Sequence, residues 1–347
     1  MHMHNFKYVA ERGAKMLNIG ALLVGLGIIL ISAELFTNGI EWLGRRLRLS
    51  EGAVGSILAA VGTALPETLV PIIAIGFGAS EAQTEIGVGA ILGAPFMLGT
   101  LALFVTGTAA LVFALMGRRR ATMAIDDCVM KRDLKFFLIV YSIAIMAAFL
   151  SRHEYKLILA VGLVCAYGVY AYRTITGGEC VEGDDLNPLI FSRSAALPRF
   201  RHIFLQVAGA VAGIVGGAEL FVHSMESIAG IYNINPFILS VIITPIATEL
   251  PEKFNSVIWV SRGKDTLALG NITGAMVFQS SIIPAIGIAM TPWVLNTTAL
   301  TCALVALSSA GMVLLLLSLK GYLRAYTLLI GGAFYSLFLF LVLGLKV

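Results

Sequence analysis

A cluster of charged residues lies within an apolar stretch of the chain. Residues 242–256 read ITPIATELPEKFNSV and hold Glu249, Glu252 and Lys253 around Pro251. A charge at the centre of a membrane span costs at least about 2.5 kcal/mol, so charged residues in spans indicate function by default. The chemistry of this cluster therefore depends on whether the stretch lies in a membrane.

The composition identifies the chain as an all-α integral membrane protein. Of its 347 residues, 58% are hydrophobic and 13% charged, against about 25% charged in a soluble domain. The mean hydropathy is +0.91. The four cysteines show no metal-binding spacing and are interpreted as packing or loop residues.

Ten apolar stretches are long enough to be membrane spans, which need about 20 residues each. They are 18–44, 51–77, 84–117, 134–151, 155–173, 202–230, 235–261, 266–290, 296–318 and 322–345. The third is too long for one straight span, so it is expected to tilt or to extend beyond the bilayer.

Lys and Arg are concentrated in the loops after the odd-numbered spans, as in the run Arg118–Arg120. Cytoplasmic loops carry such an excess, so both termini are predicted to lie outside. The loop 175–201 is then cytoplasmic. The net charge of +4 mostly reflects this bias, and nucleic-acid binding is not expected.

The two halves of the sequence resemble each other. Three pairs of segments align, the first two at an offset of 185 residues and the third at 181: AELF at 33–36 and 218–221, GTALPET at 62–68 with ATELPEK at 247–253, and GAILGAPF at 89–96 with GNITGAMV at 270–277. Repetition alone is also explained by gene duplication in any membrane protein.

Each half holds five predicted spans, so the halves are expected to be inverted relative to each other. The first repeat covers 1–174 and the second 202–347, with 175–201 connecting them. Inverted repeats of this kind place a transport site near the bilayer midplane, on interrupted helices.

A proline precedes a glutamate in both repeats, at Pro66–Glu67 and Pro251–Glu252. Proline inside a helix disturbs the carbonyl four residues earlier, and in lipid that oxygen needs a partner. A kink stabilised by neighbouring helices is one explanation. Because a carboxylate follows directly in both repeats, the pattern favours an oxygen-lined site for a hard cation such as Ca²⁺ or Na⁺.

The motifs GTALPE and ATELPE, each followed by a Gly-x-x-x-Gly-Ala stretch, resemble the two alpha-repeats of the calcium/cation antiporter superfamily, which includes the sodium/calcium exchangers. The alpha-repeats cover about 55–105 and 238–290, and the resemblance extends over the whole chain. It implies secondary active exchange of a divalent cation, most simply Ca²⁺, for H⁺ or Na⁺ by alternating access. The short central loop suggests a prokaryotic plasma (inner) membrane.

The resemblance also implies a set of cation ligands. Glu67 and Glu252 match the paired acidic ligands of the family, and Thr63 and Thr248 match the threonines that contribute oxygens beside them. Asn271 is the candidate from the eighth span.

Other family positions differ in this chain. The small hydroxyl residue after the threonine is Ala64 in one repeat and Glu249 in the other. Pro95 and Met276 replace an Asn or Asp. The eighth span keeps the polar residues Asn271, Thr273 and Gln279, whereas the matching part of the third span is almost entirely apolar. A standard set of several Na⁺ sites is therefore not expected.

Glu249 has two interpretations. It is four residues from Lys253, the spacing of an ion pair within a helix, so Lys253 could neutralise it. In the other interpretation Glu249 is a third ligand and Lys253 replaces a bound cation. Protonation of one glutamate as the ion leaves would favour coupling to H⁺, because burial raises carboxylate pKa values.

No nucleotide-binding, metalloprotease or serine-hydrolase motif occurs in the sequence, so neither an enzyme nor a cofactor is expected. The expected partners are inorganic cations and the lipid bilayer, and the oligomeric state is not specified. A passive cation channel or a sensor on the same scaffold is the alternative function.

Overall fold

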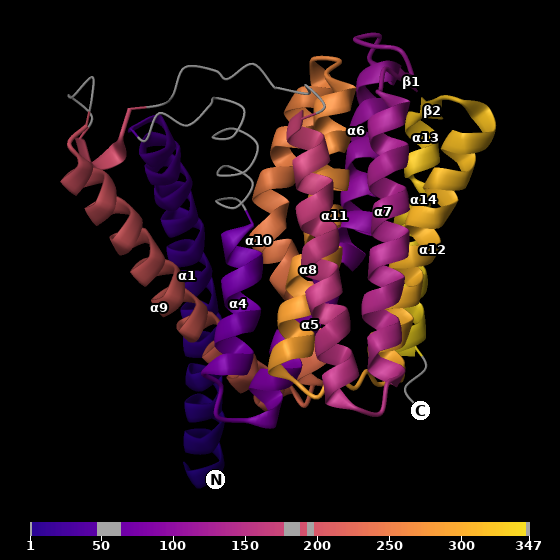
Figure 1. Ribbon diagram of the computed structural model, residues 1–347. Coiled ribbons are helices and arrows are strands. Elements are labelled where there is room, and N and C mark those ends of the chain that lie inside the picture. Colours follow the sequence, from indigo (N-terminus) through magenta and orange to yellow (C-terminus); the bar gives the residue numbers. More distant parts are fainter. Residues whose placement is uncertain (1, 47–63, 177–187, 193–197, 345–347) are drawn as a thin grey trace. The chain divides into compact units, whose positions relative to one another are not determined.

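The computed structural model describes residues 2–46, 64–176, 188–192 and 198–344 (Figure 1). Within these residues the protein is almost entirely helical. It divides into two compact units, one formed by Met1–Gly87 with Gly168–Pro236 and the other by Val88–Tyr167 with Phe237–Val347. Each unit combines segments from both predicted repeats, and each is described by itself.

The first unit is built around two long helices. Its elements are α1 (His2–Arg46), α4 (Leu65–Gly76), the start of α5 (Glu81–Met97), the end of α8 (His153–Thr176), the 3₁₀ turn η4 (Ile190–Ser192) and α9 (Phe200–Tyr232). Helix α1 packs along α9 (Figure 1). A Cβ on Gly25 would lie 3.0 Å from the carbonyl oxygen of Gly217, and the reverse distance is also 3.0 Å. Small residues thus let the two backbones approach closely.

An apolar cluster connects this helix pair to α4. Phe36 of α1 and Ala210 and Ile214 of α9 form its buried centre. Leu65 and Leu69 of α4 pack against them because they lie four residues apart, on one face of their helix. The cluster therefore holds the start of α4, where Glu67 lies, on the α1–α9 pair.

The second unit contains the remaining helices and one two-stranded ribbon. Its elements are the rest of α5, the π-helix η2 (Leu98–Ala102), α6 (Leu103–Leu115), β1 (Thr122–Met123), α7 (Asp127–Met146), η3 (Ala147–Phe149), most of α8, α10 (Pro236–Ser261), α11 (Asp265–Met290), α12 (Thr297–Lys320), β2 (Leu323–Arg324), α13 (Ala325–Leu328), α14 (Ile330–Leu339) and the π-helix η5 (Phe340–Gly344). Strands β1 and β2 pair antiparallel, with Thr122 opposite Arg324.

Glycines let α5 and α10 approach closely in this unit. A Cβ on Gly89 would lie 2.8 Å from the carbonyl oxygen of Phe237, and one on Gly93 would lie 2.8 Å from that of Val241. These glycines belong to the GAILGAPF motif. Their absent side chains bring α5 against α10, the helix that carries ATELPEK.

Among the residues that the structure describes, seven helices are long and apolar enough to cross a membrane. They cover 15–43, 81–115, 153–174, 200–232, 265–290, 297–320 and 325–342. Helix α4 and residues 236–249 are shorter apolar helices, and α7 fills the predicted fourth span. The third predicted span is a single helical run from 81 to 115 with a π segment inside it. An all-α membrane fold is confirmed, while the count of ten spans stays a prediction.

Candidate cation-binding site

Glu67 lies at the start of a helix. Helix α4 begins at Leu65, so Pro66 occupies the first turn, where a missing N–H is tolerated. The Glu67 side chain is only 5% exposed. In the same turn the Thr68 hydroxyl donates to the Ala64 carbonyl oxygen at 2.6 Å. Thr63 lies outside the described residues, so its predicted role stays a prediction.

Glu249 of α10 is bound by a residue of α11. Its side chain is 1% exposed, and its Oε1 accepts a hydrogen bond from Gln279 Nε2 at 2.7 Å. The neighbouring Thr248 is also buried, and its hydroxyl donates to the Thr244 carbonyl at 3.1 Å. Residues 248 and 249 therefore place a hydroxyl and a carboxylate side by side inside the second unit.

The second proline does not interrupt its helix. Helix α10 runs from Pro236 to Ser261 through Pro251, whereas α4 begins at its proline. One proline removes one N–H, and the turns on either side can still form, so the expected break at Pro251 is not seen as a helix end. Glu252 and Lys253 lie in this helix, but their side chains are outside the described part. The proposed ion pair of Glu249 with Lys253 therefore stays untested.

Helix α11 contributes the remaining polar groups. Asn271 is half-buried, whereas Gln279 is buried. Among the described residues, Gln279 Oε1 has no hydrogen-bond partner. This oxygen is an acceptor beside the Glu249 carboxylate, and carbonyl and carboxylate oxygens are the ligands that hard cations prefer. The sequence marks Gln279 as polar, but its contact with Glu249 depends on how two helices pack.

The predicted site residues divide between the two units. Glu67 belongs to the first unit, and Thr248, Glu249 and Asn271 belong to the second. The structure brings Glu249 together with Gln279 within the second unit, while the Thr248 hydroxyl bonds to its own helix.

Asp133 of α7 is a buried acid that sequence reasoning missed. It is 2% exposed, and its Oδ2 accepts a hydrogen bond from the Thr273 hydroxyl of α11 at 2.8 Å. Lys131, Arg132 and Lys135 surround it in the sequence, so the segment resembles an ordinary basic loop. The interruption of that basic run by one acid is the signal that could have found it.

Glu226 of α9 is held by the turn between α4 and α5. Its Oε1 accepts from the Ser80 hydroxyl at 2.6 Å and its Oε2 from Gln83 Nε2 at 2.7 Å. Gln83 also lies 3.2 Å from Nδ1 of His223. All four residues are in the first unit, and the network fastens α9 to the turn before α5 and to the start of α5.

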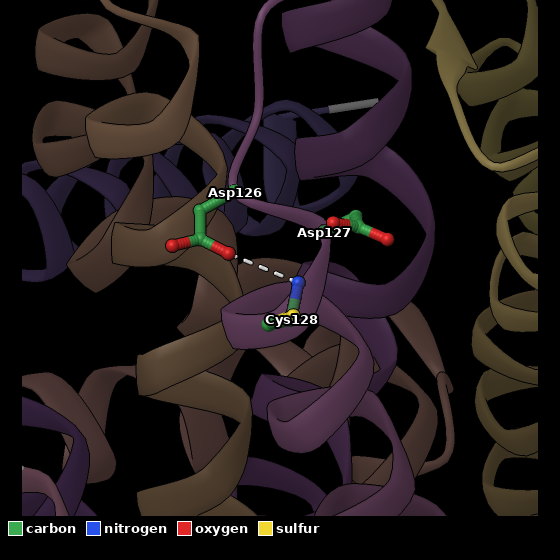
Figure 2. A group of neighbouring side chains, drawn as sticks. All are labelled: Asp126, Asp127 and Cys128. Atoms are coloured by element: carbon green, nitrogen blue, oxygen red, sulfur yellow. Dashed lines mark hydrogen bonds between the residues drawn. The ribbon is translucent and has the colours of Figure 1, made fainter.

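Asp126, Asp127 and Cys128 form another group of possible metal ligands (Figure 2). Asp126 is the N-cap of α7 and accepts from the backbone N–H of Cys128 at 3.0 Å, as Figure 2 shows. The hydrogen bond from Lys131 to Asp127, at 2.6 Å, lowers the pKa of the Asp127 carboxyl. Helix capping and this ion pair account for both acids, and the group carries no further argument for a metal.

Comparison with known proteins places the chain in a class of transporters. The sequence profile of the family described as sodium/calcium exchanger protein matches residues 17–176 and 202–346. These ranges contain both proline–glutamate motifs and nearly all of the described helices. The chain therefore belongs to the sodium/calcium exchanger protein family, and it is a multi-pass membrane antiporter of that family.

Two relatives cover most of the chain. The protein named as antiporter CaxA, from Alkalimonas amylolytica, is 27% identical over 304 residues, which are 86% of this chain and 89% of CaxA. Inner membrane protein YrbG of Escherichia coli strain K12 is 26% identical over 285 residues, covering 80% of this chain and 81% of YrbG.

Solved structures of exchangers share the fold. The H⁺/Ca²⁺ exchanger CAX superposes with a TM-score of 0.70 at 14% identity, covering 98% of this chain and 88% of CAX. The sodium–calcium exchanger NCX_Mj superposes with a TM-score of 0.56 at 20% identity, covering 96% of this chain and 100% of that one. At these identities the likeness is one of fold.

Proposed function

We propose that the protein is a secondary active antiporter that exchanges a divalent cation, most simply Ca²⁺, for H⁺ or Na⁺ across a prokaryotic plasma (inner) membrane. The observation that carries the proposal is Glu249, a buried carboxylate held by Gln279 within one of the two repeated motifs. The other motif holds the buried Glu67. The related CAX and NCX_Mj proteins are named as exchangers of H⁺ with Ca²⁺ and of sodium with calcium.

The proposed cation ligands are the polar residues of both motifs and of α11. The acids Glu67 and Glu252 supply charge, and Glu249 is a third acid in the same motif as Glu252. The other candidate ligands supply neutral oxygen atoms, and they are Thr63, Thr248 and Asn271. A hard cation in a low-dielectric setting needs both charge neutralisation and several oxygen atoms, which this set provides.

The proposed architecture is ten transmembrane helices in two inverted five-helix repeats. The first repeat is 1–174, the connecting loop 175–201 is cytoplasmic, and the second repeat is 202–347. Both termini lie outside in this arrangement. Exchange follows if the cation and its counter-ion compete for the same acids, because the site then changes sides only when one of them is bound.

The choice between H⁺ and Na⁺ as the counter-ion depends on how many oxygen ligands the protein offers to Na⁺. Pro95 and Met276 occupy positions where the superfamily has oxygen-bearing side chains. Neither residue binds a hard cation through its side chain, so H⁺ is the favoured counter-ion, carried by one of the acids when the divalent cation leaves.

Transport of ⁴⁵Ca²⁺ into proteoliposomes tests the proposal. Uptake should require an imposed gradient of H⁺ or Na⁺, and the gradient that drives it identifies the counter-ion. Glu67→Gln and Glu252→Gln should each lower the rate at least tenfold, because each removes a charged ligand. Glu81→Gln, at an exposed position in the first turn of α5, is the matched control and should leave the rate unchanged.

Three results would count against parts of the proposal. Unchanged flux in both glutamate variants removes the ligand assignment. A lasting current under voltage alone, with no counter-ion gradient, indicates a passive cation channel instead. Binding of ⁴⁵Ca²⁺ without any flux indicates a sensor on the same scaffold.

A further inference from the structure

Asp133 puts a carboxylate on the buried face of α7. This face continues with Phe137 and Tyr141, four and eight residues further along, and both aromatic side chains are fully buried. The packing of these two aromatic side chains is enough to hold α7 in the second unit, so this face does not need a charged residue for stability. A carboxylate in such a position therefore needs a specific reason.

The two oxygen atoms of Asp133 have different partners. Oδ1 accepts from Arg132 Nε at 3.2 Å, and the Arg132 side chain is 37% exposed. Oδ2 accepts from the Thr273 hydroxyl of α11 at 2.8 Å. The partly exposed Arg132 thus neutralises the carboxylate at Oδ1, while Oδ2 binds Thr273 of α11. Hydrogen bonds to a charged group are stronger than neutral ones.

Helix α11 carries a second polar contact on another side. Gln279 donates to Glu249 of α10 at 2.7 Å. Successive residues of an α-helix are rotated by about 100°, so Gln279 projects about 120° away from Thr273. Asn271 projects about 160° away from Thr273. Two polar contacts on different sides therefore define the rotation of α11 about its own axis.

Large side chains pack one side of α11 near Asn271, since Leu269 and Ile272 are fully buried. Among the described residues, no atom would lie within 4 Å of a Cβ built on Gly270 or on Gly274. These two glycines lie four residues apart, on one face of α11. The contact of Thr273 with Asp133 adds a directional hydrogen bond to the apolar packing of the buried side.

We propose that Asp133 is a positioning residue for cation binding. Through Thr273 it fixes the rotation of α11, and this rotation places the Gln279 amide on Glu249 and sets the direction of Asn271. The proposal rests on the proposed function, since it assigns Asp133 an effect on the affinity for the transported cation. It predicts that loss of the contact changes affinity more than it changes the maximal rate.

The first experiment measures ⁴⁵Ca²⁺ transport by Thr273→Val and Thr273→Ser proteins. Valine keeps the shape of threonine without the hydroxyl, whereas serine keeps the hydroxyl. Valine should raise the half-saturating Ca²⁺ concentration by about tenfold or more, as expected for one lost hydrogen bond to a charged group, with the maximal rate within about twofold. Serine should restore the wild-type value. Thr106→Val, which removes a buried hydroxyl with no partner among the described residues, is the matched control.

A double-mutant cycle shows whether Asp133 acts through Thr273. Asp133→Ala combined with Thr273→Val should be no worse than the more severe single variant, because both remove the same contact. Additive effects would overturn the proposal. Equal half-saturation in the valine and serine variants, or lower protein yield with unchanged affinity, would assign the pair a purely structural role and would also overturn it.

A second experiment does not depend on transport. In a protein whose native cysteines are replaced, Asn271→Cys is labelled with a small maleimide. Adding Thr273→Val should change the labelling rate more than threefold, whereas adding Thr273→Ser should not. Equal rates would overturn the proposal even if the wild type moves no Ca²⁺, an outcome that would count separately against the proposed function.

Discussion

At the scale of single residues, the neighbours of a buried carboxylate indicate its role. Glu249 accepts from a neutral amide, Gln279, whereas Asp133 accepts from both a hydroxyl and a guanidinium. An amide orients a carboxylate without cancelling its charge, whereas the Arg132 guanidinium balances the charge of Asp133. The proposed roles follow this difference, with Asp133 positioning α11 and Glu249 as a candidate ligand of the cation.

Replacing Gln279 with methionine should weaken cation binding. Methionine has a similar length but removes both the donor to Glu249 and the Oε1 acceptor. The half-saturating Ca²⁺ concentration should rise at least about tenfold, since a hydrogen bond to a charged group contributes about 1.5–3 kcal/mol. Met276→Leu, an equally buried apolar exchange on the same helix, is the control. An unchanged value for Gln279→Met in transport assays would contradict the role given to this amide.

Sequence patterns predicted the buried acids better than their partners. Glu67 and Glu249 follow from charges within apolar motifs, and both are buried. The contact of Glu249 with Gln279 joins residues 30 positions apart on two helices, so it depends on helix rotation, which a sequence pattern does not encode. Asp133 escaped notice because three basic neighbours made its segment look like a loop.

Lys156 of α8 is a buried cation with a structural task. It is 5% exposed, and its Nζ donates to the carbonyl oxygens of Pro292 at 2.6 Å and Trp293 at 3.2 Å. Trp293 has a left-handed backbone, with φ of 47°, and its indole N–H donates to Ala144 at 2.9 Å. The ammonium group thus stabilises the chain just after the end of α11.

Lys156→Met should destabilise the second unit. Methionine keeps the apolar stem but leaves two buried carbonyls without their ammonium donor, at a cost of about 1–3 kcal/mol. Thermal unfolding of the purified protein in detergent, followed by tryptophan fluorescence, measures the loss. Lys264→Met, at an exposed position, should leave the unfolding temperature unchanged. Equal unfolding temperatures for Lys156→Met and the wild type would rule out this task.

At the scale of elements, a buried ion pair holds the junction between α10 and α11. The two terminal guanidinium nitrogens of Arg119, Nη1 and Nη2, each donate to one oxygen of the Asp265 carboxylate at 2.6 Å. The Arg119 side chain is 7% exposed and that of Asp265 is 2% exposed. Arg119 also donates to the carbonyl of Val260 near the end of α10, and Asp265 accepts from the N–H of Ala124. Two helices and the loop after α6 therefore meet at one pair of charges.

Breaking this pair should have a large effect. Asp265→Asn leaves the Arg119 charge buried without its carboxylate, which typically costs about 3–5 kcal/mol. The unfolding temperature should fall well below that of the wild type. Asp127→Asn, which breaks the partly exposed pair with Lys131, is the matched control and should change it little. A similar small change in both variants would mean that the Arg119 pair does not hold the junction.

The helices themselves were largely predictable, and their interruptions were not. Apolar runs located helix in every predicted span, because lipid-compatible segments must satisfy their backbone internally. The two prolines of the repeated motifs behave differently, since Pro66 starts α4 and Pro251 lies inside α10. Identical tripeptides thus occur in different helical contexts, which are set by the residues around them and not by the motif.

At the scale of the whole molecule, compact units and sequence repeats divide the chain differently. Each unit takes segments from both halves, with α1 and α9 in one and α10, α11 and α12 in the other. The two AELF segments, in α1 and in α9, fall in the same unit, whereas Glu67 and Glu249 of the second aligned pair fall in different units. The helices α1 and α9, which carry the two AELF segments, therefore pack against each other within one unit.

The inverted arrangement makes a prediction about sidedness. In the proposed arrangement, five spans in each half put both termini on the same side, and the bias of Lys and Arg puts them outside with the loop 175–201 in the cytoplasm. Glu81 and the exposed Cys128 flank the third predicted span, so they should lie on opposite sides. In intact cells whose other cysteines are replaced, a membrane-impermeant maleimide should label Glu81→Cys, in a protein that also lacks Cys128, and should not label Cys128.

Opening the cells should make Cys128 reactive, which controls for simple burial. Epitope tags on the two termini should both be accessible in intact cells, while a protease site inserted in 175–201 should be cut only after the cells are opened. Tags on opposite sides would require an odd total number of spans. The halves could then not be inverted copies of five helices, and the equivalence of Glu67 and Glu252 would lose its structural basis.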